Sequence, residues 1–329
     1  MTALVTGATG FIGSAVARQL LAKGHAVRVL ARRGGDRRNI DGLPVEIVEG
    51  DLRDPAACRH ALAGVRDLFH VAADYRLWVR DPSAMYATNI DATVALMRAA
   101  ADAGVSRIVY TSSVATLGYR PDDAPSDEGT PASLPDMVGP YKRSKFLAEE
   151  AVLRMAREEK LPIVIVNPST PIGPRDVRPT PTGRIVVEAA TGRVPAFVDT
   201  GLNVVHVDDV AFGHILAHEK GEAGERYILG GHNLRLEEIL AAIARLVGRK
   251  PPRIKLPAAA VMPVAYASEA LAAVNRRWEP FITVTGVRLA KKQMFFSSAK
   301  AERKLGYSAR PAEEALADAI SWFQANGYL

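Results

Sequence analysis

The sequence predicts an α/β protein built on a doubly wound parallel sheet, with a smaller C-terminal lobe interleaved with it. One observation is the alternation of helical stretches with short apolar runs, which begin at Ala3, Ala26, Val45, Asp67, Arg107 and Pro162. Another is a change to proline-rich loops from Pro168 to Pro181. A third is the short segment 225–229, which ends in Tyr-Ile-Leu and predicts that the chain rejoins the first sheet there. We therefore assign about 1–166 and 203–230 to the first domain, and about 167–202 and 231–329 to the second lobe.

Composition narrows the class of protein. With 329 residues, of which 48% are hydrophobic and 24% charged, the chain can bury a large core. Its single cysteine, Cys58, excludes an internal disulfide and is typical of a reducing compartment, so we expect a cytoplasmic protein without a secretory signal. The net charge of +6 comes without an aromatic-interleaved basic patch, and the seven histidines lack ligand spacing. We therefore expect neither a nucleic-acid partner nor a metal.

A glycine-rich turn links the first strand to the first helix. The spacing Gly-x-x-Gly-x-x-Gly follows the apolar residues Ala3–Thr6 and precedes a helical stretch. A turn without side chains lets a pyrophosphate approach the backbone, and the amides at a helix N-terminus favour an anion. The pattern predicts a dinucleotide site formed by Gly7, Thr9, Gly10, Phe11, Ile12 and Gly13.

The second strand ends at Arg32 and Arg33, where dinucleotide folds place an acid for the ribose of NAD or an arginine for the phosphate of NADP. The sequence therefore favours NADP(H), with Arg32 as the contact, Arg33, Arg37 and Arg38 adding positive charge, and NAD(H) as the alternative. Asp51 and Leu52, after the third strand, would lie beside the adenine, although an ordinary aspartate at a strand end is nearly as good an interpretation.

A tyrosine and a lysine four residues apart carry the catalytic hypothesis. Pro140 suits the first turn of a helix, so Tyr141 and Lys145 share one face. A nearby ammonium group favours the phenolate, so we expect Lys145 to lower the pKa of Tyr141 and to contact the nicotinamide ribose, with Tyr141 as general acid and base. Ser113 follows the strand 107–111, at the edge where open α/β sheets bind ligands, and would polarise a carbonyl.

Together these motifs resemble the extended short-chain dehydrogenase/reductase family, of the NAD-dependent epimerase/dehydratase type, over essentially the whole chain. Within it the sequence looks like the dihydroflavonol 4-reductase-like branch, and 167–176 and 201–209 look like the hopanoid-associated sugar epimerases. The resemblance implies a Rossmann fold, Ser-Tyr-Lys catalysis and further cofactor contacts at Ala72, Ala73 and Pro168.

Three departures from the nucleotide-sugar epimerases favour a reductase. Thr170 stands where the resemblance implies a sugar-binding asparagine, and Leu202 where it implies a pyrophosphate-binding arginine. Arg32 is the third, because epimerases usually retain NAD. We therefore hold three hypotheses: NADPH-dependent reduction of a ketone or aldehyde on a polyol-like or hydrophobic substrate, epimerisation or dehydration of a sugar with a retained nicotinamide, and cofactor sensing without chemistry.

The substrate is a small molecule whose contacts the sequence indicates weakly. Loop positions of the resemblance suggest Asp74, Arg76, Trp78 and Thr170. The apolar faces of 89–103 and 141–159 predict a homodimer, unless they pack on the sheet. The apolar stretch 256–274 contains two prolines and a glutamate, so we expect a buried or dimer-adjacent helix rather than a membrane span, with peripheral membrane contact as an alternative.

Overall fold

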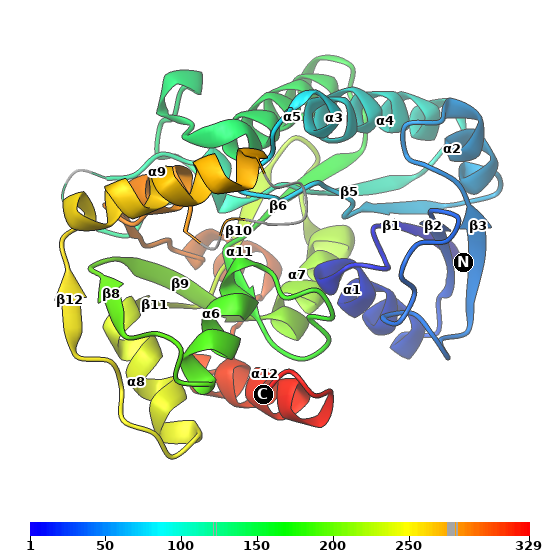
Figure 1. Ribbon diagram of the computed structural model, residues 1–329. Helices are drawn as coiled ribbons and strands as arrows, with labels where there is room; N and C mark the ends of the chain where they lie inside the picture. Colours follow the sequence, from blue (N-terminus) through cyan, green and yellow to red (C-terminus); the bar gives the residue numbers. More distant parts are fainter. Residues whose placement is uncertain (121, 123, 275–279, 281) are drawn as a thin grey trace.

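The computed structural model describes residues 1–120, 122, 124–274, 280 and 282–329. Its first sheet has seven parallel strands in the order β10-β6-β5-β4-β1-β2-β3, which confirms the predicted doubly wound fold (Figure 1). The strands are β1 (Thr2–Thr6), β2 (Ala26–Ala31), β3 (Val45–Glu49), β4 (Asp67–His70), β5 (Arg107–Thr111), β6 (Ile163–Pro168) and β10 (Arg226–Leu229).

Helices cover both faces of this sheet, and the strands alternate between two cores. One face carries α1 (Phe11–Ala22), α7 (Val207–Lys220) and α11 (Ala299–Leu305). The other carries α2 (Pro55–Leu62), α4 (Ala92–Asp102) and α5 (Gly139–Glu158). In β1, Ala3 and Val5 face the first core and Leu4 the second. This period of two explains why the strands have continuous apolar runs.

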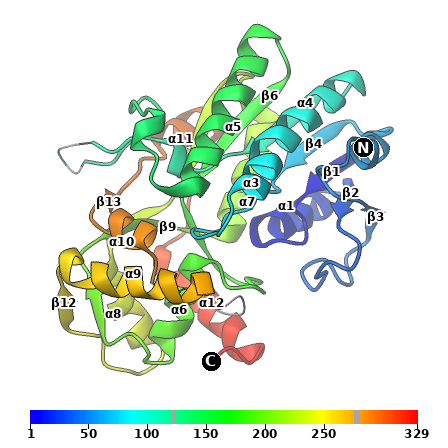
Figure 2. The ribbon, with the colours of Figure 1, turned by 45° about the horizontal axis from the view of Figure 1, so that its top comes forward.

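The second lobe has its own small sheets, formed by β7 (Thr170–Ile172), β9 (Gly201–His206), β11 (His232–Arg235) and β13 (Gln293–Met294), and separately by β8 (Ala196–Val198) with β12 (Ile254–Leu256). The helices described in this lobe are α6 (Pro181–Ala190), α8 (Leu236–Leu246), α9 (Ala258–Val274), α10 (Val284–Leu289) and α12 (Ala312–Ala325). Figure 2 shows this lobe beside the first sheet. β9 straddles the boundary that we predicted near residue 203, and it pairs with strands of the second lobe.

Two details differ from the sequence-based expectation. The segment predicted as loop from Pro168 contains β7, which pairs in parallel with β9. Its Pro171 is tolerated because β7 lies at a sheet edge, where an amide donor can be spared. The helix expected from residue 89 begins with a four-residue helix α3 (Ser83–Tyr86) and a π-helical turn η1 (Ala87–Asp91) ahead of α4.

The interleaving brings distant segments to one edge of the sheet. The chain leaves β6 for the second lobe and returns through α7 to β10, which rejoins the first sheet near the predicted residues and pairs with β6. Two short 3₁₀ turns complete the fold, η2 (Val114–Thr116) directly after β5 and η3 (Leu134–Asp136) before α5. The carboxyl ends of β1, β2, β4, β5 and β6 therefore converge with the start of α5.

Candidate active site

The glycine turn leaves room for a ligand because its backbone packs too closely for side chains. Gly7 has φ +73°, and a Cβ there would lie 2.7 Å from the Ala72 amide nitrogen. A Cβ on Gly13 would lie 2.2 Å from the Gly7 carbonyl oxygen. Gly10 is exposed at the N-cap of α1. These contacts make an open, amide-lined turn at a helix N-terminus, which fits a pyrophosphate.

The other predicted residues of this turn lie around it. The carbonyl of Thr9 accepts a hydrogen bond from the Asn39 side-chain amide at 3.2 Å, which ties the turn to the loop after β2. Phe11 and Ile12 are the partly buried first residues of α1. The Ala72 amide donates to Thr6 Oγ1 at 3.3 Å, so the strand end that carries Ala72 and Ala73 lies against the turn.

Arg32 adds a positive charge beside two aspartates that are already paired with other arginines. Its charge helps to lower the pKa values of Asp51 and Asp74, so it lies near both carboxylates. Asp51 pairs with Arg53 at 2.9 Å, which is the main reason that its pKa falls to about 2. The Arg32 side chain is exposed and, within the described part of the chain, donates no hydrogen bond. Such a guanidinium suits a phosphate.

Neighbouring arginines contribute less free charge than we expected. Arg37 pairs with Glu49 at 2.5 Å, and Arg38 pairs with Asp36 at 2.7 Å. Their positive charges are therefore compensated locally. Arg33 is exposed, and no hydrogen bond of its side chain occurs among the described residues. It makes a natural comparison for Arg32.

Tyr141 and Ser113 meet at the carboxyl edge of the sheet. Ser113 is the N-cap of η2, where its Oγ accepts from the Ala115 amide at 3.1 Å. Burial raises the pKa of Tyr141 above its ordinary value of 10.0, and a side-chain hydrogen bond with Ser113 opposes this rise. The expected lowering by Lys145 does not describe this state. A phenol with such a pKa is protonated at neutral pH.

Hydrogen bonds to β5 fix the position of Lys145, one helical turn after Tyr141 on α5. Its Nζ donates to Tyr110 Oη at 3.0 Å and to the Thr111 carbonyl at 2.8 Å. The side chain is 2% exposed, and burial lowers the pKa of Lys145 to about 8, with Glu149 opposing the change. The ammonium is therefore engaged by β5 rather than by Tyr141.

The loop with Asp74 is tied to the catalytic helix. Asn89, in the π-helical turn, accepts from the Asp74 amide and donates to the Asp74 carbonyl, both at 2.8 Å. Its amide also donates to Ser144 Oγ at 2.9 Å, between Tyr141 and Lys145 on α5. π-Helical turns are frequent at functional sites, and this one joins two predicted site segments.

Comparison with known proteins places the chain in a family. The sequence model of the NAD dependent epimerase/dehydratase family matches residues 3–230. The chain belongs to this family. Members and relatives are enzymes that act with a nicotinamide cofactor, so the protein is an enzyme of the extended short-chain dehydrogenase/reductase fold.

Three relatives cover nearly the whole chain. A putative dihydroflavonol 4-reductase of Synechocystis sp. is 40% identical over 99% of this chain and 95% of its own length. Sterol demethylase protein B of Methylococcus capsulatus is 36% identical over the whole of both chains. The crystal structure of gox2253 is 53% identical, covers 100% of this chain and 99% of its own, and superposes with a TM-score of 0.89. These matches confirm the predicted family resemblance and its dihydroflavonol reductase-like relatives.

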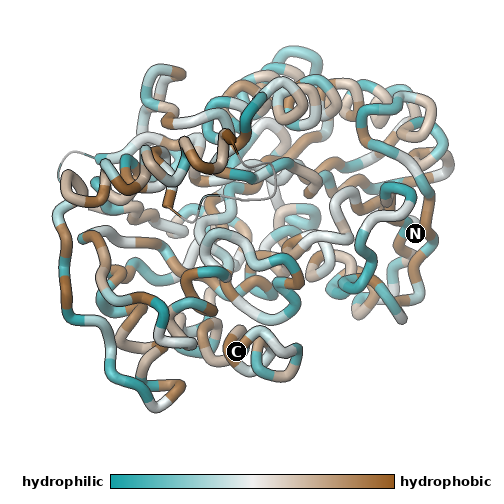
Figure 3. The backbone as a smooth tube through the Cα atoms, viewed as in Figure 1, coloured by the Kyte–Doolittle hydropathy of each residue, from teal (hydrophilic) through white to brown (hydrophobic). Residues whose placement is uncertain are grey.

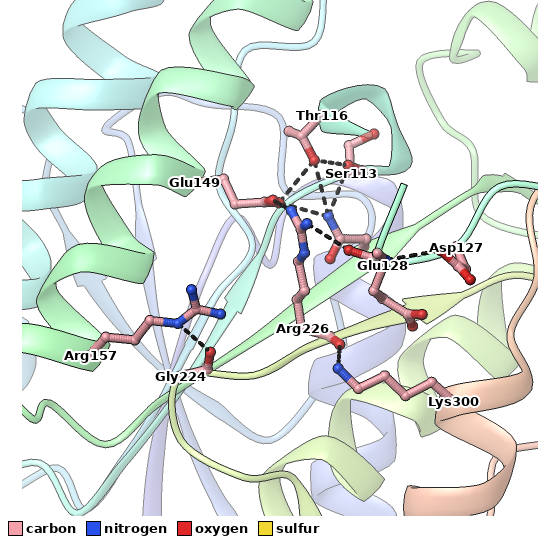
Figure 4. A network of polar contacts seen from close by, with 11 residues as sticks. Ser113, Thr116, Asp127, Glu128, Glu149, Arg157, Gly224, Arg226 and Lys300 are labelled. Atoms are coloured by element: carbon pink, nitrogen blue, oxygen red, sulfur yellow. Dashed lines mark hydrogen bonds and ion pairs between the residues drawn. The ribbon is translucent and has the colours of Figure 1, made fainter. Parts of the chain in front are cut away.

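A buried polar network that the sequence analysis missed supports the active edge (Figure 4). Glu149 accepts from Thr116 Oγ1 at 3.0 Å and from the Asn167 amide at 2.7 Å, and pairs with Arg226 at 2.8 Å. The Asn167 amide also donates to the Ser113 carbonyl at 3.0 Å. The network therefore links α5, β6 and β10 to the backbone of Ser113.

Spacing could have indicated part of this network. Glu149 follows Lys145 by four residues, as Lys145 follows Tyr141, so the three share one face of α5. Arg226 and Glu128 come from distant segments, and the Arg226 side chain donates to the Glu128 carbonyl at 2.6 Å. Only the fold could place them here.

The predicted substrate residues have varied surroundings. Asp74 and Arg76 pair with each other at 2.5 Å. This ion pair is typical of a loop that is stabilised by its own charged side chains. Trp78 is half-buried, Pro168 is the buried last residue of β6, and Thr170 is half-buried in β7. Among the described residues no group of three or more histidine, cysteine or acidic side chains could hold a metal ion.

Proposed function

We propose that this enzyme is an NADP(H)-dependent oxidoreductase that reduces a ketone or aldehyde on a polyol-like or hydrophobic substrate. The observation that carries the proposal is Tyr141 beside Ser113 at the carboxyl edge of β5, where burial raises the pKa of the phenol and so favours its protonated form. A reductase needs a proton donor beside a carbonyl-polarising hydroxyl, and these two side chains have that chemistry.

The glycine turn, Ala72, Ala73 and Pro168 would hold the cofactor, with Arg32 at its phosphate and Asp51 and Leu52 near its adenine. The bound cofactor supplies a hydride at its nicotinamide ring. Ser113 Oγ would donate to the substrate oxygen, and Tyr141 Oη would transfer its proton to that oxygen. Lys145 makes two hydrogen bonds to β5. Its positive charge would stabilise the tyrosinate that remains after the proton transfer.

The preference for NADP(H) rests on Arg32. The carboxylates near Arg32, those of Asp51 and Asp74, are each paired with an arginine two residues further along the chain. A phosphate bound at Arg32 would therefore meet net positive charge. The hydrophobic option for the substrate is favoured by the half-buried Trp78 and by the name of the Methylococcus relative, which refers to a sterol. A link to hopanoids rests on the subgroup resemblance alone.

The second candidate is a sugar epimerase or dehydratase with a retained nicotinamide. The family match favours it, because the family takes its name from these reactions. The third is a cofactor-sensing protein, which the intact set of Ser113, Tyr141 and Lys145 disfavours. We also propose a cytoplasmic homodimer through the outer faces of α4 and α5, where Ala95 and Leu147 are exposed.

The test is the stoichiometry of the cofactor. Hydrophobic and polyol-like carbonyl compounds are offered with NADPH, and cofactor oxidation is compared with alcohol formed. The proposal requires one NADPH consumed for each alcohol. Turnover of a sugar with catalytic dinucleotide and no net consumption would make the protein an epimerase, and tight binding without turnover of any compound would favour the sensing protein.

A further inference from the structure

Helix α9 has an apolar surface that the fold leaves uncovered. The inner side of α9 packs against α10 and the residue Ile282 just before it. Together they form a small hydrophobic cluster that includes Val261, Ala265 and Val284. The opposite stripe is exposed and consists of Ala260, Pro263, Val264, Ala267, Ala270, Leu271 and Val274. A helix on a water-exposed surface normally carries polar residues on that stripe.

The outer face also lacks charge. Among the 17 residues of α9 the one ionisable carboxylate belongs to Glu269, which is partly buried and accepts from the Val284 amide at 2.7 Å. Leu271 is 57% exposed and Val274 88%. Water therefore meets apolar side chains along the whole stripe, which is unfavourable unless another apolar phase covers them.

The apolar surface continues onto β12, which leads into α9 along the same edge of the molecule (Figures 1 and 2). Figure 3 shows hydrophobic segments on both elements. The large exposed apolar side chains of this α9–β12 surface are Ile254, Leu256, Val264, Tyr266, Leu271 and Val274.

Exposed basic residues lie in the segment that enters β12 and alternate with its exposed apolar residues. Arg249, Lys250, Arg253 and Lys255 are exposed just before or within β12. Asp199 pairs with Lys255 at 2.7 Å and lies 3.8 Å from Arg235, so it compensates part of this charge. Within the described residues, Lys250 and Arg253 have no carboxylate partner. Exposed apolar side chains with uncompensated cations on the adjoining segment complement the surface of an anionic bilayer.

The inner side of α9, opposite the exposed stripe, adjoins the proposed active site. The Arg80 guanidinium, two residues after Trp78, donates to the Ala272 carbonyl near the end of α9. Gly139, two residues before Tyr141, lies against Thr285 of α10, on which α9 packs; a Cβ there would be 2.9 Å from the threonine side chain. The substrate loop and the start of α5 therefore both contact the α9–α10 unit.

We propose that the α9–β12 surface docks on an anionic lipid bilayer, with the apolar stripe of α9 in the interface and the basic residues at the headgroups. No helix among the described residues is long and apolar enough to cross a membrane, so this docking is peripheral. The docked helix would hold the substrate loop, which contacts its inner side, close to the lipid surface. Resting on the proposed function, this assigns the substrate to membrane-soluble carbonyl compounds or alcohols.

The test is cosedimentation of the full chain with vesicles of phosphatidylcholine, alone or mixed with phosphatidylglycerol. The wild type should bind the mixed vesicles more tightly. Leu271→Glu should weaken binding at least about tenfold, because it puts a charge into the interface in place of a buried leucine. Replacing Lys250 and Arg253 by glutamine should reduce the preference for anionic vesicles by about fivefold for each charge.

Ile47→Glu is the matched control, since Ile47 is an exposed apolar residue of β3, in the other lobe. It should leave vesicle binding unchanged. Dinucleotide binding by each variant reports the fold separately, so a failed cofactor proposal and a failed docking proposal can be distinguished. Absence of vesicle binding by the wild type, or equal binding by Leu271→Glu, would overturn the docking. A wild-type dimer that Leu271→Glu dissociates, without vesicle binding, would show that a second copy covers α9 instead.

Discussion

Helices α5 and α9 break the usual rule of burial in opposite directions. α5 buries polar groups, among them Lys142, Lys145 and Glu149, each at most 4% exposed. α9 exposes apolar groups, including Leu271 and Val274. Both arrangements cost stability, because a buried charge loses hydration and an exposed apolar side chain orders water.

The difference indicates two kinds of function. The cost of α5 is offset inside the protein, where Tyr110, Thr111, Thr116, Asn167 and Arg226 satisfy its polar groups. For α9, no described residue covers the outer stripe, and the docking proposal assigns that role to a lipid surface. Departures from consistent patterning are expected at functional sites.

The largest expected effect concerns Tyr141 on α5. Tyr141→Phe removes the proton donor but keeps the ring, so turnover should fall by about 10²–10⁴-fold. Dinucleotide binding should persist, since the glycine turn is untouched. Steady-state cofactor oxidation measures the turnover, and calorimetry measures the dinucleotide binding. Tyr227→Phe, at a buried tyrosine of β10 whose hydroxyl accepts from the Glu222 amide, is the control and should keep the rate. A Tyr141→Phe enzyme with wild-type turnover would remove Tyr141 from the chemistry.

The next effect concerns the stability of the polar network. Glu149→Gln leaves Arg226 without its carboxylate in a largely buried place, so the free energy of unfolding should fall by about 3 kcal/mol. Denaturant unfolding measures it. Glu150→Gln changes the adjacent, exposed residue and should stay within about 0.5 kcal/mol of the wild type. Equal losses in the two variants would mean that the network adds no stability.

The smallest effect is a pH dependence caused by the buried lysines of α5. Burial lowers the pKa values of Lys142 and Lys145 to about 8, from 10.5 in an exposed lysine. Between these pH values the unfolded chain binds more protons than the folded one, so the contribution of each lysine to stability rises with pH. Lys142→Met should remove about half of this contribution. Urea unfolding of both proteins between about pH 8 and 9.5, below the ordinary pKa of tyrosine, measures the difference. Parallel curves would contradict it.

The sequence predicted the first sheet well because its strands are buried on both faces and separated by clear helices. It also placed Gly7 in a turn at the start of a helix, Ser113 directly after β5 and Tyr141 in the first turn of α5, because these positions depend on local turns and on spacing within one helix. Sequence patterns missed Arg226, since no local feature indicates that it meets Glu149 across 77 positions. The pKa of Tyr141 was predicted in the wrong direction, because spacing shows neither the burial that raises it nor that β5 takes the Lys145 ammonium.

Calorimetry of NADPH, NADP, NADH and NAD binding tests the central claim. This claim is that the enzyme binds NADP(H) through Arg32 and uses it together with the polar side chains of α5. The wild type should prefer NADPH, and Arg32→Ala should weaken NADPH and NADP by about tenfold or more while leaving NADH and NAD unchanged. Arg33→Ala, at the adjacent exposed arginine, should have a much smaller effect. Preference of the wild type for NAD, or a dinucleotide retained through purification with no effect of Arg32→Ala, would contradict the account and favour the epimerase.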